Sequence, residues 1–457
     1  MGLTYDYRGV KIKKVDIAVI GAGPAGLGAG AELSGQTGVA WEIFEASNRV
    51  GGLASSRVDR NGFTWDLGGH VIFSKSRIFN SAVKNALGGG ALTHIRDSFV
   101  KMKRRFIPFP VQNNIHRLPV KVSRECLEGM KKAASSNGKP ADFEEWIGHT
   151  LGGGLAKHFM VPYNKKLWAY PLSGIGFGWI DGRVSLPPLK SVLGALRNGR
   201  DETRWGPNAT FVFPLKGGTG GLFKKIAEPF AKKINFRKEA VEIDPEKKIV
   251  RFKDGAKIKY KKMITAAPLD RLVTKIISGA PPEVVEAAKS LCSNSGWMVG
   301  IGVNRKIRTK RCWVYFPNEK TPFYRVTYFS NYSPCNVPDP KRQTSLLCEI
   351  STGSSVASVN GADIADRTID ALINEGILRK SDRNLIATRW KIRLPYLYPI
   401  PTLKRDAALK TIHPWLKKQS IYSIGRFGGW RYEEGNMDHA YLAGRKTAGL
   451  LVDRRDE

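Results

Sequence analysis

The sequence predicts an α/β protein with a discontinuous nucleotide-binding domain, a helical insertion and an antiparallel β-sheet domain. Three observations support this fold class. Residues 15–33 read as strand, glycine-rich turn and helix, residues near 120–200 carry helical patterns, and residues 295–400 are dense in aromatic and β-branched residues. At 457 residues the chain exceeds one typical core, so two or three domains are expected.

The segment VDIAVIGAGPAGLGAGAEL, residues 15–33, is the most informative part of the chain. Its apolar, β-branched start predicts a buried parallel strand, and residues 25–33 predict a helix. Gly21, Gly23 and Gly26 form a G-x-G-x-x-G turn between them. In such a turn the first glycine permits the tight bend, the second lets the backbone approach a pyrophosphate, and the third lets helix and strand pack closely. This order of elements predicts a Rossmann-type dinucleotide-binding domain.

The second predicted strand, residues 41–44, leads into residues that favour FAD as the dinucleotide. Glu45 follows that strand about 20 residues after the turn, where a carboxylate normally holds a ribose hydroxyl. Arg49, Gly51 and Gly52 match an R-x-G-G element found in many flavoproteins. Its glycines let the backbone touch a bulky cofactor, and its arginine neutralises diphosphate. Together with the glycine turn, these residues favour FAD over NAD.

The C-terminal segment GRFGGW, starting at Gly425, adds a second place where backbone can contact the cofactor. Asn436, Met437 and Asp438 open a further predicted helix, residues 438–451. Its free N–H groups would face the electron-rich edge of the flavin. Asp438 is equally compatible with an ordinary helix N-cap.

Composition narrows the function classes. The chain has 74 Lys and Arg against 40 Asp and Glu, a net charge of +34. These charges are dispersed and no nucleic-acid recognition module accompanies them, so we expect no specific nucleic-acid partner. Five cysteines at irregular spacings predict neither a disulfide framework nor a metal site. With the polar N-terminus and no long apolar run, they predict a cytoplasmic protein without a membrane span.

Several further segments share one resemblance. They are WDLGGHVIFS (65–74), PFPVQNN (108–114), VPYNKKLWAYP (161–171), GRVSLPP (182–188), WGPNATFVFPLKGGTGG (205–221), FYRVTYFSNYSP (323–334), LYPIPTLKRD (397–406) and GRFGGWRYEEGNMDHAYLAG (425–444). In this order they resemble the UDP-galactopyranose mutase family, in its eukaryotic-type branch. The resemblance implies an FAD-dependent isomerase that interconverts UDP-galactopyranose and UDP-galactofuranose without net redox. It further implies a covalent adduct of the sugar with reduced FAD, and NADPH or NADH as reductant.

The resemblance also implies site residues, each of a type that suits a nucleotide sugar. The implied catalytic residues are His70, Arg183 and Arg325. Two planar guanidinium groups are a natural clamp for a diphosphate. Gly69, Arg426 and Asn436 would contact the flavin. The implied substrate-binding residues are Phe109, Gln112, Asn164, Trp168, Asn208, Tyr315, Tyr332, Tyr398 and Tyr432.

The two arginines differ in how strongly their surroundings favour a ligand. Arg325 lies in an aromatic, β-branched run, where an unpaired charge would be costly. Arg183 lies in a loop rich in glycine and proline, where a solvated charge is an equal alternative. Two other classes of protein also remain open: a flavin amine-oxidase-like oxidoreductase, and a basic nucleic-acid-binding protein without enzymatic activity.

Domain boundaries follow from these alternations of pattern. The FAD-binding Rossmann-type domain is predicted at residues 1–110, 210–285 and 405–457. A mainly helical substrate domain with mobile loops is predicted at 111–209, and a β-sheet domain at 286–404. Within the first of these, a β-hairpin is expected around Asp254 and Gly255.

Overall fold

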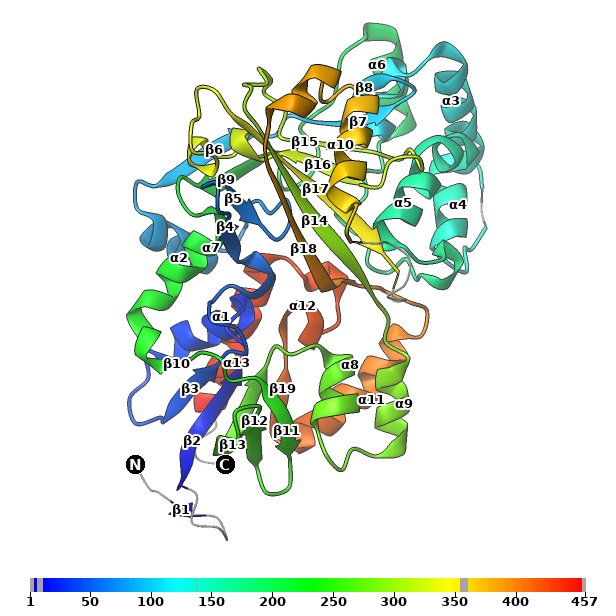
Figure 1. Cartoon of the computed structure of the whole chain (residues 1–457). Helices are drawn as coiled ribbons and strands as arrows, with labels where there is room; N and C mark the ends of the chain where they lie inside the picture. Colours follow the sequence, from blue (N-terminus) through cyan, green and yellow to red (C-terminus); the bar gives the residue numbers. More distant parts are fainter. Residues whose placement is uncertain (1–3, 6–10, 137, 354–360, 454–457) are drawn as a thin grey trace.

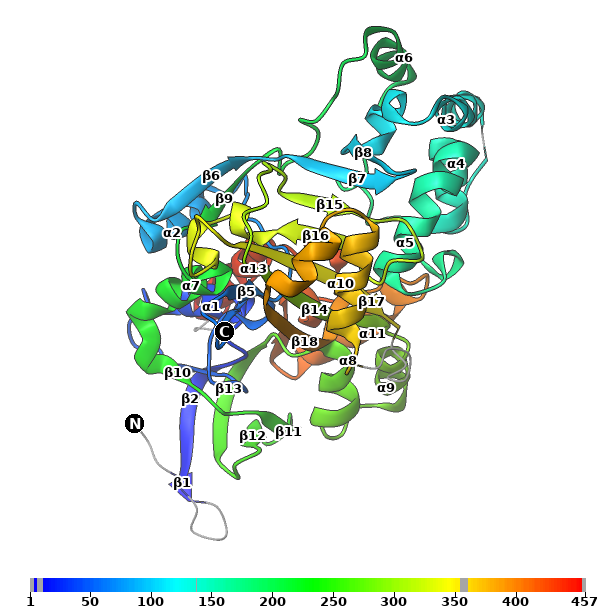
Figure 2. The ribbon, with the colours of Figure 1, turned by 45° about the horizontal axis from the view of Figure 1, so that its top comes forward.

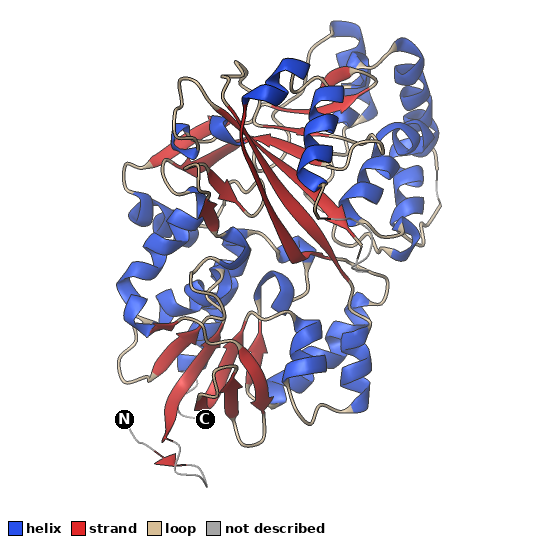
Figure 3. Cartoon of the chain, in the orientation of Figure 1, coloured by secondary structure: helices blue, strands red, loops and turns tan. Residues whose placement is uncertain are grey.

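The computed structural model describes residues 4–5, 11–136, 138–353 and 361–453. Two large sheets form separate layers, each flanked by helices (Figures 1 and 3). In Figure 1 the sheet built around the N-terminal strand lies below, and the sheet of the long strands β14 (Ser293–Val303) and β18 (Ile386–Pro399) lies above it. The predicted mixed α/β class is confirmed.

The lower sheet has the order β10-β3-β2-β13-β12-β11, with β1 on β2 and β19 on β13. Its strands are β1 (Thr4–Tyr5), β2 (Lys11–Ile20), β3 (Trp41–Phe44), β10 (Ile234–Asn235), β11 (Ala240–Asp244), β12 (Ile249–Phe252), β13 (Lys257–Thr265) and β19 (Ile421–Ser423). The pairs of β2 with β3 and β13, of β3 with β10, and of β13 with β19 are parallel. The predicted strands and the hairpin at Gly255 are confirmed.

Helix α1 (Pro24–Leu33) follows β2 and packs against the C-terminal helix α13 (Met437–Asp453). Their axes approach closely because small residues face each other. A Cβ added at Gly28 would lie 2.0 Å from the Tyr441 carbonyl oxygen, and one at Gly444 would lie 1.9 Å from that of Ala25. Two segments at opposite ends of the chain thereby pack together against the lower sheet.

The upper sheet has the order β18-β14-β17-β16-β15-β7-β8. Its remaining strands are β7 (Ser98–Met102), β8 (Arg105–Pro108), β15 (Trp313–Tyr315), β16 (Arg325–Tyr328) and β17 (Thr344–Thr352). All of its pairs are antiparallel except β7 with β15. Strands β7 and β8 lie here although the sequence places residues 98–108 in the nucleotide-binding domain. Helix α10 (Ile364–Asn374) lies against β14 and β18 (Figure 2).

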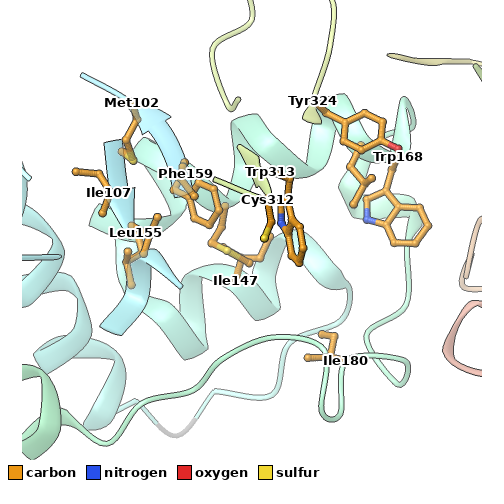
Figure 4. Close-up of a cluster of buried hydrophobic side chains, with 14 of the residues drawn as sticks. Met102, Ile107, Ile147, Leu155, Phe159, Trp168, Ile180, Cys312, Trp313 and Tyr324 are labelled. Carbon is orange, nitrogen blue, oxygen red and sulfur yellow. The ribbon is translucent and has the colours of Figure 1, made fainter. Parts of the chain in front are cut away.

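The helical insertion stands beside the upper sheet (Figures 1 and 2). It contains α3 (Val120–Ala134), α4 (Phe143–Leu155), α5 (Val161–Trp168) and α6 (Leu189–Asn198). One buried apolar cluster joins these helices to the sheet. Figure 4 shows Leu155 and Phe159 of the insertion beside Ile107 and Trp313 of the sheet.

Shorter elements connect the layers. They are the strand pairs β4 (Ser56–Val58) with β5 (Thr64–Asp66) and β6 (Ala91–Ile95) with β9 (Thr210–Pro214), and the helices α2 (Arg77–Leu87), α7 (Gly218–Ala227), α8 (Leu269–Arg271), α9 (Pro282–Lys289), α11 (Arg405–Lys418) and α12 (Gly425–Gly428). All five cysteines are free thiols. Among the described residues, no helix has the length and apolar character to cross a membrane.

Candidate active site

A cavity of about 1080 Å³ brings together residues from the upper sheet, the helical insertion, and helices α12 and α13 of the lower layer. The loop after β5 supplies Gly69 and His70 to its wall, and the upper sheet supplies Arg325. The insertion supplies Arg183, and the segment before α13 supplies Asn436. Residues predicted from distant parts of the sequence therefore share one space.

The predicted glycine turn has the conformation that a phosphate-binding turn requires. Gly21 has a φ of +100°, which favours glycine. A Cβ at Gly26 would lie 1.8 Å from the Gly21 carbonyl oxygen, so strand and helix approach closely there. Gly23 is the N-cap of α1 and brings no side chain to the first turn. The free N–H groups of the first turn of α1 and the positive end of its helix dipole are therefore available to an anion.

The R-x-G-G loop packs against this turn. The Gly51 amide donates to the Ala22 carbonyl oxygen over 2.8 Å. A Cβ at Gly52 would lie 3.2 Å from the Gly23 Cα, so the two backbones nearly touch. Arg49 is exposed, and its Nε donates to Asn48 Oδ1 over 3.1 Å. Next along the chain, Leu53 lines the cavity, which links this backbone cradle to the space beyond it.

Glu45 is held rigidly at the end of β3. Its Oε2 accepts a hydrogen bond from the Ala22 amide over 2.7 Å, and its Oε1 accepts one from the Ser47 amide over 2.8 Å. Each carboxylate oxygen can accept a second hydrogen bond, so ribose hydroxyls can still bind. The cradle of glycines and this carboxylate fit the adenosine diphosphate part of FAD.

The C-terminal residues predicted to contact the cofactor lie beside α1 and the cavity. Gly425 has a φ of +81°, and a Cβ there would lie 3.0 Å from that of Ala25 in α1. Arg426, which follows it, donates from Nε to the Gly435 carbonyl oxygen over 2.9 Å. Arg426, Asn436 and Met437 all line the cavity. Asp438 also lines it and accepts a hydrogen bond from Ser74 Oγ over 2.7 Å, which ties α13 to the loop after His70.

Gly69 and His70 form a tight bend against the upper sheet. The Gly69 amide donates to Glu349 Oε1 over 3.1 Å, and a Cβ at Gly69 would lie 2.6 Å from Thr327 Oγ1. His70 Nδ1 is buried and has no hydrogen-bond partner among the residues that the structure describes. Burial, with the positive charges of Arg426 and Arg325, lowers the pKa of His70 to about 4. The imidazole is therefore neutral at physiological pH and presents an unsatisfied buried nitrogen.

Arg325 lines the cavity but already has a carboxylate partner. Its Nε and Nη2 donate to Glu349 Oε1 and Oε2 over 2.5 and 2.8 Å, and the Tyr324 hydroxyl donates to Oε2 over 2.8 Å. Burial acts to raise the pKa of Glu349, but the charge and hydrogen bonds of Arg325 outweigh it and hold that pKa below its ordinary value. The sequence predicts a ligand diphosphate as the partner of Arg325, and the structure adds a buried ion pair with Glu349.

Arg183 has a different environment. Its guanidinium lies 4.7 Å from the centre of the Tyr432 ring, and its Nη2 donates to the Glu433 carbonyl oxygen. Arg183, Tyr432 and Glu433 all line the cavity. The sequence left a solvated loop charge as an equal alternative for Arg183. The structure instead places Arg183 on the wall of the cavity.

Of the predicted substrate residues, Phe109, Asn208, Tyr315, Tyr398 and Tyr432 line the cavity. The Phe109 and Tyr315 rings lie 5.2 Å apart between centroids, and Asn208 Oδ1 accepts from Arg96 Nη1 over 2.7 Å. Tyr398 faces the Tyr324 hydroxyl at 3.2 Å. These side chains could hold a planar base and polar sugar groups.

The other four predicted substrate residues pack behind that wall. Trp168 stacks edge-on against Tyr432 with centroids 4.9 Å apart. Tyr332 is fully buried beside Phe211 and Phe213, and the amides of Gln112 and Asn164 donate to the backbone of Ser185 and Met160. None of the four lines the cavity, and Trp168 and Tyr332 pack directly against residues that do, Tyr432 and Phe211.

Three residues of the site were missed by sequence reasoning: Glu349, Tyr324 and Arg96. Glu349 stands alone as an acid in the apolar run SLLCEIS, which was a detectable signal of a buried charge. Its pairing with Arg325 depends on the register of β16 and β17. Arg96 is buried and donates to the Thr203 and Trp205 carbonyl oxygens as well as to Asn208, which holds the loop over the cavity.

Comparison with known proteins matches this geometry. A family model described as flavin containing amine oxidoreductase matches residues 24–452. A crystal structure of reduced UDP-galactopyranose mutase superposes with a TM-score of 0.92 at 36% identity, over 97% of this chain and 95% of that one. The chain belongs to the UDP-galactopyranose mutase family. The predicted resemblance is confirmed, and its eukaryotic-type branch stays a prediction.

More distant structures share the fold with this mutase-family chain. Putrescine oxidase bound to putrescine superposes with a TM-score of 0.66 at 15% identity, over 96% of this chain and 99% of that one. Cyclohexylamine oxidase from Brevibacterium oxydans superposes with a TM-score of 0.68 at 14% identity, over 97% and 100%. At these identities the likeness shows the fold alone.

Proposed function

We propose that this protein is an FAD-dependent isomerase that interconverts UDP-galactopyranose and UDP-galactofuranose without net redox. The observation that carries this proposal is the single cavity whose wall combines flavin-side residues with two arginines. The 36% identity to reduced UDP-galactopyranose mutase over nearly the whole chain supports the choice of substrate. A cytoplasmic location and reduction by NADPH or NADH are parts of the same proposal.

The predicted flavin residues divide between two regions. Gly21, Gly23, Glu45 and Gly52 would hold the adenosine diphosphate part, and Arg426 would lie near the ring system. When bound and reduced, the flavin would supply the nucleophile and the electron pair for exchange at the anomeric carbon. No side-chain nucleophile is then required of the protein.

The protein's own residues would hold the leaving diphosphate. Arg183 and Arg426 donate to backbone carbonyl oxygens, and no carboxylate in the described part of the chain forms an ion pair with either. The pair of Arg325 with Glu349 is neutral overall. Arg325 would therefore orient the diphosphate through hydrogen bonds more than it would add net positive charge to the cavity. Fixed donors of this kind stabilise charge on the departing phosphate oxygen with little reorganisation.

The neutral imidazole of His70 suits contact with the sugar or the flavin rather than donation of a proton from a charged ring. Burial and the nearby charges of Arg426 and Arg325 lower its pKa to about 4, which leaves the ring neutral at physiological pH. We assign His70 an orienting role. The unsatisfied Nδ1 is the atom through which it would act.

The alternative, an amine-oxidase-like oxidoreductase, is supported by the family model. A cationic amine would, however, meet the positive charges of Arg183 and Arg426 on the cavity wall. Like charges at short range in a partly buried site are repulsive. The wall therefore favours an anionic nucleotide sugar.

The test is incubation of the purified protein with UDP-galactofuranose, with and without dithionite, followed by chromatography of the nucleotide sugars. The proposal predicts UDP-galactopyranose in the reduced sample and none in the oxidised one. Peroxide formed from amines, with UDP-galactofuranose left unchanged, would show the oxidase alternative instead.

A further inference from the structure

Arg405 is a buried arginine outside the cavity with a two-point ion pair. Its Nη1 and Nη2 donate to Glu433 Oε2 and Oε1 over 2.9 and 3.0 Å, and its Nε donates to Asp406 Oδ1 over 3.0 Å. Only 6% of the side chain is exposed. A fork of parallel hydrogen bonds fixes the orientation of the carboxylate as well as its position.

The partner of Arg405 lies in the short turn that touches Arg183. Tyr432–Glu434 forms one 3-10 turn, and the Glu433 side chain points away to Arg405. The carbonyl oxygen of the same residue accepts from Arg183 Nη2, and the neighbouring Tyr432 ring lies under the Arg183 guanidinium. Glu433 thereby connects the buried Arg405 to Arg183, which lines the cavity.

The segment that leads into Arg405 also braces the chain before Arg183. The Gly176 amide donates to the Pro401 carbonyl oxygen over 2.8 Å, and the Leu403 amide donates to that of Gly174 over 3.2 Å. Ile175 and Thr402 form an isolated antiparallel bridge. Two segments position Arg183: its own loop and the turn at Tyr432–Glu434. Both are thus attached to residues 401–405.

We infer that Arg405 is a positioning residue for diphosphate binding, acting through Glu433 on Arg183. This inference rests on the proposed function, because it gives Arg183 a nucleotide diphosphate to bind. Without the fork, the Glu433 carboxylate turns to water or to Arg431, which lies 3.6 Å away. The carbonyl oxygen and the Tyr432 ring then no longer hold the guanidinium toward the cavity.

The test is a double-mutant cycle on UDP binding by the FAD-loaded protein, measured by titration calorimetry. Arg405→Met is made alone and in an Arg183→Ala background. We expect Arg405→Met to weaken UDP binding about 10-fold when Arg183 is present and less than about 2-fold when it is absent, because coupled residues are non-additive. Arg405→Lys restores the charge without the fork, so it should recover part of the loss.

A matched control is available beyond the end of β14. Arg305 also makes a two-point contact, through Nε and Nη2, with Asp382, which is 1% exposed, and neither residue lines the cavity. Arg305→Lys should leave UDP binding unchanged.

Equal weakening in both backgrounds would overturn the inference, because Arg405 would then act on the fold in general. UDP binding unchanged by both Arg405 variants would also overturn it. Failure of the parent protein to bind UDP would overturn the proposed function together with this inference.

Discussion

Arg325 and Glu349 face each other in register across β16 and β17 and form hydrogen bonds of 2.5 and 2.8 Å. The same carboxylate accepts hydrogen bonds from the Gly69 amide and the Tyr324 hydroxyl. One acid therefore connects the upper sheet, the bend that carries His70 and the wall of the cavity. Arg325 is held in place before any ligand arrives.

Breaking this pair should be costly for folding. Glu349 is 1% exposed, so Glu349→Ala leaves the Arg325 guanidinium without its buried counter-charge. We expect the free energy of unfolding, measured by denaturant titration, to fall by about 3–5 kcal/mol. Replacement of both partners, Arg325→Met with Glu349→Leu, should recover much of that loss.

The matched control for this prediction is the exposed pair of Arg251 with Glu242, whose side chains are 45% and 48% exposed. Glu242→Ala should cost less than about 1 kcal/mol. A Glu349→Ala variant as stable as the parent would contradict the importance of the buried pair.

Arg325 should also matter for the ligand when its charge is retained. Arg325→Lys keeps a cation beside Glu349 but loses the planar fork, so it cannot keep the two-point contact with the carboxylate while it donates to a diphosphate. We expect UDP binding to weaken roughly 10-fold, a loss of about 1.4 kcal/mol, with FAD content unchanged. An unaltered dissociation constant for UDP would remove Arg325 from the proposed diphosphate clamp.

The glycine turn allows cofactor binding to be separated from folding. A Cβ at Gly23 would lie 3.9 Å from the Gly52 Cα, which is ordinary contact, whereas one at Gly26 would lie 1.8 Å from the Gly21 carbonyl oxygen. Gly23→Ala should therefore preserve the melting temperature of the apoprotein and lower its affinity for FAD. Gly26→Ala should lower the melting temperature itself. If Gly23→Ala takes up FAD as the parent does, the pyrophosphate does not lie at this turn.

His70 should make the stability of the protein depend on pH. Its pKa in the folded protein is about 4, below the ordinary 6.5, so the unfolded chain takes up a proton first as the pH falls. Stability present above pH 6.5 is therefore lost as the pH falls toward 4, by up to roughly 3 kcal/mol. The unfolding free energy of His70→Gln should fall less steeply over this window. Parallel pH profiles for parent and variant would contradict the buried, neutral imidazole.

Local patterns predicted the nucleotide-binding elements well, because each depends on neighbours in the sequence. The strand before Gly21, the helix after it and the strand before Glu45 are confirmed. The partner of Arg325 was not predictable in this way, because strand register sets it across the fold. For the same reason, the sequence assigned residues 98–108 to the nucleotide-binding domain, whereas β7 pairs with β15 of the upper sheet.

Side-chain direction was the second limit. Trp168 and Tyr332 were predicted as substrate residues from a resemblance that fixes positions along the chain. Whether a large aromatic residue faces a cavity or supports the residue in front of it depends on packing among several elements. Here Tyr432 lines the cavity and Trp168 packs against it.

The ratio of reductant consumed to sugar converted tests the central claim most directly. The protein, its FAD and a limiting amount of NADPH are mixed with excess UDP-galactofuranose without oxygen, and both NADPH and the nucleotide sugars are quantified. An isomerase without net redox should convert many molecules of UDP-galactofuranose for each NADPH consumed. Consumption of one NADPH per sugar converted, or of NADPH with no UDP-galactopyranose formed, would contradict the account.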